Sequence, residues 1–185
     1  MKKIIVLAIS LAGYASLGTA NAASTGTLNF NGEITGATCK TEVNGTSSAT
    51  VTLPTVSNSQ LQSAGNTAGK TSFTIELSEC DALGSMTQGT AFFESGLATI
   101  IETGRLKNTA QTNAASNVTL QLRDDLSDEV IKVGDSTQTT SNTYVNLPTS
   151  GGAKARLPYT VEYYAEGAVT AGKVESSVLY SIQYK

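Results

Sequence analysis

The sequence contains no histidine and no tryptophan, and only two cysteines and three prolines, among its 185 residues. Without an imidazole, the chain cannot build a Ser-His-Asp or Cys-His catalytic arrangement, and it cannot hold zinc or haem through histidine. Much of hydrolase chemistry is excluded on this ground. The length predicts a single domain.

Charged residues are also scarce, at 15% of the chain, with 12 lysines and arginines against 15 aspartates and glutamates. The sequence pI is near 4.9. Such a chain lacks the basic surface that a phosphate backbone requires, so we expect no nucleic-acid partner.

The first 22 residues have the three parts of a secretory signal peptide. Lys2-Lys3 supplies a positive start, Ile4 to Leu11 is almost wholly apolar, and Ala20-Asn21-Ala22 places small residues where signal peptidase cleaves. A membrane anchor is the alternative, but the apolar run is shorter than the roughly 20 residues that span a bilayer. We therefore predict that residues 1–22 are removed and that an exported domain begins at Ala23.

Cys39 and Cys80 are predicted to form one disulfide. An exported chain enters an oxidising compartment, where two cysteines pair by default. Closing a loop of about 40 residues stabilises the fold by roughly 4 kcal/mol in the chain-entropy model. The alternative, a redox or metal-binding pair, lacks both the Cys-x-x-Cys spacing and histidine partners.

The rest of the chain alternates between apolar and polar residues, and helical periodicity is nearly absent. Alternation that is rich in Val, Ile and Thr predicts strands, and turn residues between them favour an all-β sandwich of immunoglobulin type. Residues 54–70 and 108–117 are predicted loops. The predicted strands are residues 27–34, 50–53, 71–77, 90–93, 98–101, 118–124, 130–133, 156–164 and 174–184.

Both ends of this exported domain have the pattern of a strand. Near its start, Leu28, Phe30, Gly32 and Ile34 fall on one face behind a polar lead. A chain terminus usually frays, so an apolar strand that runs to the end of the chain must pair with something. An ordinary last strand of the sandwich is one reading of the C-terminus. The residues that share its apolar face are Val174, Val178, Tyr180, Ile182 and Tyr184, with Ser176 as the weak position.

Several motifs spread over residues 23–185 match one known family. Residues 26–34 read Gly-Thr-Leu-Asn-Phe-Asn-Gly-Glu-Ile, and Ala37-Thr38-Cys39 follows them. Residues 118–124 read Val-Thr-Leu-Gln-Leu-Arg-Asp, and residues 158–164 read Pro-Tyr-Thr-Val-Glu-Tyr-Tyr. Tyr184 is penultimate, and Gly172 is fourteenth from the end. With these features the chain resembles the structural pilins of chaperone-usher fimbriae, the type 1 and P pilus group.

The resemblance implies an incomplete immunoglobulin-like sandwich that lacks its final strand. An apolar groove would then lie open along the C-terminal strand. A periplasmic chaperone would lend a strand to this groove, and at an outer-membrane usher the N-terminal extension of the next subunit would replace it. The residues implied at the groove edge are Gly172, Val174, Val178, Tyr180, Ile182 and Tyr184.

The resemblance also implies which segment donates the strand. The pilin domain would span residues 23–185, with residues 23–33 as the donor extension. Leu28 and Phe30 would be its anchors, and Gly32 resembles the small residue that the family places over a shallow pocket. Ile34 continues the same face of the donor strand. Assembly of this kind needs no catalytic residue.

The function implied is that of a structural subunit. Copies of the chain would polymerise into a fibre on the cell surface that is used in adhesion, and a host-surface receptor would be reached through the fibre. The alternative is a one-domain minor tip or adaptor pilin that binds a receptor directly. An additional lectin domain has no room within residues 23–185.

The remaining candidates for chemistry are weak. Asp124, Asp125, Asp128 and Glu129 offer oxygens of the kind calcium prefers, but they lack the spacing and central glycine of an EF-hand loop, which favours a solvated hairpin turn. The Gly-x-Ser-x-Gly motif of hydrolases is absent. The tyrosines of the predicted strands indicate packing rather than a sugar-binding platform. We predict no catalytic residue, no metal site and no cofactor, and hence no enzyme.

Overall fold

The computed structural model describes residues 28–32, 34, 36–46, 49–81, 83–149 and 152–185. The chain divides into two units, residues 1–33 and residues 34–185. The predicted signal peptide and its cleavage site lie outside the described residues, as do residues 23–27 and 33 of the predicted donor extension. Among the described residues, no helix has the length and apolar character needed to cross a membrane.

The described part of the first unit, residues 28–32, has no regular secondary structure. Leu28 and Phe30 are 75% and 83% exposed. Ile34, the first residue of the second unit, is also fully exposed and outside any strand. The strand predicted at residues 27–34 is therefore not formed by the described residues of that stretch.

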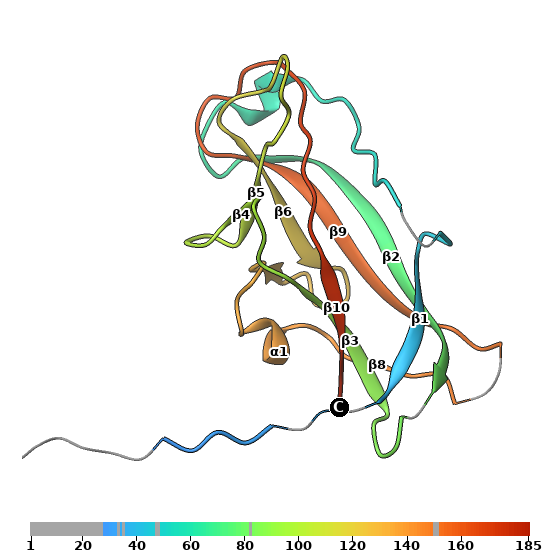
Figure 1. Ribbon diagram of the computed structural model, residues 1–185. Coiled ribbons are helices and arrows are strands. Elements are labelled where there is room, and N and C mark those ends of the chain that lie inside the picture. Colours follow the sequence, from blue (N-terminus) through green and yellow to red (C-terminus); the bar gives the residue numbers. More distant parts are fainter. Residues whose placement is uncertain (1–27, 33, 35, 47–48, 82, 150–151) are drawn as a thin grey trace, which may run out of the picture. The chain divides into compact units, whose positions relative to one another are not determined.

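The second unit consists of two antiparallel sheets (Figure 1). The larger sheet has the order β1-β2-β9-β6-β5-β4, with β7 pairing the end of β6 beyond β5, and the smaller sheet has the order β10-β3-β8. The predicted all-β sandwich is confirmed, with two short helices added. The elements are β1 (Thr38–Val43), η1 (Asn58–Leu61), β2 (Thr67–Asp81), β3 (Gln88–Phe93), β4 (Thr99–Ile100), β5 (Arg105–Lys107), β6 (Val118–Asp124), β7 (Val130–Ile131), α1 (Gln138–Ser141), β8 (Val145–Asn146), β9 (Ala155–Ala165) and β10 (Tyr180–Tyr184).

The core lies between the two sheets and contains a cluster of three aromatic rings. The ring of Phe93 meets Tyr159 edge-on with centroids 5.0 Å apart, and Phe73 lies 5.8 Å from Tyr159. The buried Tyr159 hydroxyl accepts a hydrogen bond from the backbone N–H of Ala91 at 3.1 Å, which joins β9 of the larger sheet to β3 of the smaller one. Desolvation by this burial raises the pKa of Tyr159.

Strand β3 is closed on the edge that faces away from β10. β8 covers its beginning, and buried side-chain amides cover the rest. Asn142 Nδ2 donates to the carbonyl of Ala91 at 2.9 Å. The side chain of Gln138 accepts from the N–H of Phe93 at 2.9 Å and donates to its carbonyl at 3.0 Å. The segment that contains α1 therefore takes the place of a neighbouring strand.

Besides the strand at residues 27–34, three predictions of secondary structure were wrong. Residues 50–53 do not form a strand. The predicted loop at residues 54–70 contains η1 and the first residues of β2, where Thr67 and Ala68 pair with Tyr164 and Tyr163. Of the strand predicted at residues 174–184, only β10 forms. Alternating side chains reveal which residues face the core, but a strand also needs a hydrogen-bonding partner, which two of these stretches lack.

Candidate functional site

In the C-terminal segment that precedes β10, every second side chain points toward the core. We call residues 174–179 the edge segment. The alternation that the sequence predicts is present here, although the segment pairs with no strand. The half-buried residues are Val174, Ser176 and Val178, and the exposed residues are Glu175, Ser177 and Leu179.

The backbone of the edge segment is hydrogen-bonded on one side only. In an extended chain, successive residues direct their N–H and C=O groups to opposite edges. On the occupied side, the carbonyl of Glu175 accepts from Thr109 N–H at 2.7 Å and that of Leu179 from Glu94 N–H at 2.8 Å. The alternate residues, which make no backbone hydrogen bond to any other described residue, are Val174, Ser176 and Val178.

A second extended stretch faces the edge segment across a groove. We call residues 49–56 the opposing segment. It belongs to neither sheet, and its backbone makes no backbone hydrogen bond to any other described residue. Its side chains Val51, Leu53 and Val56 are half-buried against the core. The carbonyl of Pro54 accepts from the Tyr163 hydroxyl at 3.3 Å. Apart from that carbonyl, the opposing segment and the groove side of the edge segment have backbone polar groups available to a strand laid between them.

The groove contains two cavities that follow each other along these two segments. One, of about 380 Å³, lies beside Ser176 and Val178, and the other, of about 420 Å³, lies beside Gly172 and Val174. The floor of the first cavity consists of core side chains, so an occupant would meet apolar surface. These floor residues are Phe73, Ile75, Phe93, Leu106, Leu120, Leu122 and Val161.

Ser176 is the smallest half-buried residue of the edge segment. Its hydroxyl oxygen is buried and has no hydrogen-bond partner among the described residues. A valine or larger residue in its place would reduce the cavity beside it. The position that appears weak in the apolar pattern is thus the position that widens the groove.

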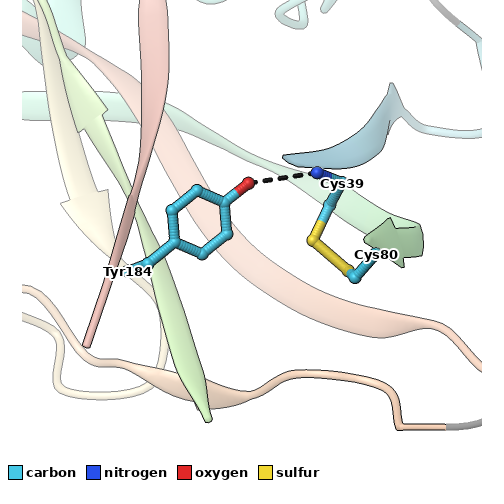
Figure 2. The surroundings of a disulfide bond; sticks show 3 residues. All are labelled: Cys39, Cys80 and Tyr184. Atoms are coloured by element: carbon cyan, nitrogen blue, oxygen red, sulfur yellow. Dashed lines mark hydrogen bonds between the residues drawn. A yellow bond between two sulfur atoms is a disulfide. The ribbon is translucent and has the colours of Figure 1, made fainter. Parts of the chain in front are cut away.

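The last two residues are held firmly. The Tyr184 hydroxyl accepts a hydrogen bond from the backbone N–H of Cys39 at 3.1 Å, and Cys39 is bonded to Cys80 as predicted (Figure 2). Desolvation raises the pKa of Tyr184, against a smaller opposite effect of this hydrogen bond. Lys185 pairs with Gln88 through its backbone, and its ammonium group lies 3.7 Å from the centroid of the Tyr144 ring.

Gly172 lies where the chain passes closest to the loop after β5. A Cβ atom at this position would lie 2.4 Å from the nitrogen of Ala115 and 2.6 Å from the carbonyl oxygen of Asn113. Both are backbone atoms, which cannot rotate away. The next residue, Lys173, donates its N–H to Asn113 at 2.7 Å and accepts from Ala115 N–H at 2.9 Å. Only glycine allows this approach without displacement of the loop.

The structure brings together the residues that the sequence places at the C-terminal edge. Gly172 and Val174 lie at one cavity, Val178 and Tyr180 at the other, and Ile182 and Tyr184 continue into β10. The sequence reasoning missed the opposing segment as a groove wall, although Val51 and Leu53 are spaced as one face of a strand. It also missed Asn108, which lies in a predicted loop and carries no periodic signal.

The remaining polar clusters have structural partners. Asp124 is buried and accepts from the N–H groups of Leu126 at 2.9 Å and Thr143 at 2.6 Å, so it caps the turn after β6. No group of three or more potential metal ligands occurs among the described residues. On the outer face of the larger sheet, Arg123 pairs with Glu162 at 2.8 Å.

The chain is similar to fimbrial proteins in sequence and in fold. The family model described as "Type-1 fimbrial protein, A" matches residues 53–185. The "Major fimbrial subunit SMF-1" of Stenotrophomonas maltophilia (strain K279a) is 42% identical over 168 residues, which cover 89% of this chain and 95% of that protein. The "F17 fimbrial protein" of Escherichia coli is 37% identical over the full length of both chains. The crystal structure of the P pilus rod subunit PapA superimposes with a TM-score of 0.51 at 17% identity, covering 87% of this chain and 100% of that one.

Proposed function

This chain belongs to the type-1 fimbrial protein family, and we propose that it assembles by donor-strand exchange between its copies. It is a chaperone-usher pilin, a structural subunit of a surface fimbrium. Its family is one of structural subunits rather than enzymes. The comparisons favour this role over that of a one-domain tip or adaptor pilin.

One observation carries the proposal: the edge segment and the opposing segment leave a groove whose walls pair with no strand on the side that faces the groove, and whose floor is apolar. An added strand would complete hydrogen bonds with Val174, Ser176 and Val178 and would cover the core side chains beneath them. Addition of a strand to an open sheet edge takes affinity from backbone hydrogen bonds and specificity from pockets for alternate side chains. The immunoglobulin-like sandwich would thereby gain the strand that it lacks.

The donor in this proposal is residues 23–33 of a neighbouring copy, with Leu28, Phe30 and Gly32 on the inward face and Ile34 next on the same face. Leu28, Phe30 and Ile34 are exposed in the single chain. The cavity beside Ser176, of about 380 Å³, has room for the ring of Phe30. Burial of each large anchor would contribute about 1.5–3 kcal/mol.

The same groove would serve a periplasmic chaperone before assembly. An exposed apolar edge promotes aggregation, so a subunit with this groove needs a temporary occupant. We propose that a chaperone strand fills it, that an outer-membrane usher is the site of exchange, and that residues 1–22 direct export. Contact with a host-surface receptor would occur through the assembled fibre.

The experiment compares two substitutions in the donor. Phe30→Asp places a carboxylate on the inward face, where the apolar cavity would reject it. Asn29→Asp introduces the same charge on the outward face and serves as the control. We expect no fibres from Phe30→Asp and normal fibres from Asn29→Asp by electron microscopy of expressing cells. Heat-resistant polymers of the Phe30→Asp chain would disprove the proposal.

A further inference from the structure

The edge segment changes partner at its middle. β10 pairs with β3 up to Tyr180, and the carbonyl of Leu179 still accepts from Glu94 N–H. Residues 173–175 instead bond to the loop that follows β5. No strand of the described chain supports this half of the segment, so another structure must hold it in an extended form.

The side chain of Asn108 provides much of this support. Its Oδ1 atom accepts from the N–H groups of Glu175 at 3.0 Å and Ala110 at 3.1 Å. Its Nδ2 atom donates to the carbonyls of Lys173 at 2.7 Å and Ala115 at 3.0 Å. A primary amide offers two donors and two acceptor sites, and all four are used here. The N–H and C=O character of the partners fixes the orientation of the amide.

These bonds act on Lys173, which directly precedes the edge segment, and on Glu175 within it. Lys173 and Glu175 are held from the side of the β5 loop, where Thr109 also donates to the Glu175 carbonyl from its N–H and from its hydroxyl. Since alternate residues face opposite edges, Val174 and Ser176 then turn their backbone groups toward the groove. The amide replaces a neighbouring strand while the groove remains empty.

We infer that Asn108 is a positioning residue for strand capture: it holds residues 173–175 extended so that the groove half beside Gly172 can accept a donor strand. This inference rests on the proposed function. Asn108 would not touch the incoming strand, because its bonds lie on the other edge of the segment. Its loss would remove one bond to Lys173 and one to Glu175 while the backbone bonds to the loop remain. Val174 and Ser176 would then leave the extended form more often, and the donor would have to order them on binding.

The test measures binding of a labelled synthetic peptide of residues 23–34 to the full chain. The full chain carries Phe30→Asp in every sample, so that it cannot donate its own strand. Asn108→Ala is compared with Asn117→Ala, the matched control. Asn117 also holds a loop through its amide, which donates to Ala168 at 2.9 Å, but it does not contact the edge segment. Thermal unfolding of each variant measures the cost to the fold.

We expect the peptide affinity to fall roughly tenfold in Asn108→Ala and to stay unchanged in Asn117→Ala. Asn108→Asp keeps the acceptor oxygen but places a carboxylate oxygen against the carbonyls of Lys173 and Ala115, which repel it. The affinity of Asn108→Asp should therefore fall at least as far as that of Asn108→Ala, and it is the second variant if Asn108→Ala folds poorly. If the peptide binds Asn108→Ala as tightly as it binds the chain that keeps Asn108, the inference is overturned and donor-strand exchange remains intact. Absence of peptide binding to the Asn108 chain itself would overturn both.

Discussion

Single residues shape the groove through backbone contacts rather than through apolar side chains. Gly172 brings the chain against the loop at residues 113–115, and Asn108 supplies four hydrogen bonds to the same region. Ser176 widens the cavity by being small. None of these roles follows from hydrophobicity, so the sequence pattern alone assigns importance to the valines and tyrosines beside them.

Substitution of Gly172 by alanine should destabilise the fold. The added Cβ would overlap backbone atoms of residues 113–115. Because overpacking of this kind typically costs 1–3 kcal/mol, we expect the free energy of unfolding to fall by about 2 kcal/mol. Gly167→Ala is the control, because its Cβ would meet Asn117 at an ordinary 3.9 Å. Urea unfolding of both variants gives the comparison. Equal stability of the two would mean that the close approach at Gly172 is unimportant.

At the scale of secondary structure, the sequence predicted most of the sandwich and was wrong mainly around the groove. The predicted strands that became β3, β6 and β9 are confirmed because each has neighbours within the same chain. Residues 50–53 and 174–179 show the side-chain spacing of strands but lack a hydrogen-bonding neighbour between them. Periodicity reports burial and not pairing, so it cannot distinguish a paired strand from a wall of an open groove.

The short segments β5, β8 and α1 could not be predicted for a different reason. Each is two to four residues long, which is too short to show a period. Their places depend on tertiary contacts, such as the bonds from Gln138 to the backbone of Phe93. By closing one edge of β3, these bonds leave β10 and the edge segment as the side at which this sheet can grow.

An acidic substitution on the inner face of β10 should damage the edge more than one on its outer face. Ile182 packs against the core and pairs with Ala91 of β3. Ile182→Asp would lose this apolar burial and would also desolvate a carboxylate, so we expect a loss of about 2–3 kcal/mol in the free energy of unfolding. Gln183→Asp adds the same charge at the next residue and should cost little. The yield of soluble periplasmic subunit measures the difference. Comparable yields of the two variants would show that Ile182 does not support the groove.

For the whole molecule, the pH dependence of stability above neutrality should reflect its buried tyrosines. Desolvation raises the pKa of Tyr159 above its ordinary value of 10.0, so the unfolded chain loses this proton at a lower pH than the folded chain does. The protonated Tyr159 hydroxyl therefore makes its full contribution to the free energy of unfolding below about pH 10. This contribution is lost as the pH rises through the folded-state pKa. Urea midpoints should therefore fall above pH 10, and the fall should be shallower in Tyr159→Phe. If the urea midpoint of Tyr159→Phe falls with pH as steeply as that of the unsubstituted chain, Tyr159 is not the source of this pH dependence.

The central claim is that the open edge of one copy is filled by a strand from the next. Hydrogen exchange of backbone amides tests it most directly, because an amide in a strand ladder exchanges slowly and an unpaired one exchanges fast. The amides of Val174, Ser176 and Val178 are predicted to exchange fast in the isolated subunit and slowly in the assembled fibre. Fast exchange of all three in the fibre, or slow exchange already in the isolated subunit, would contradict the claim.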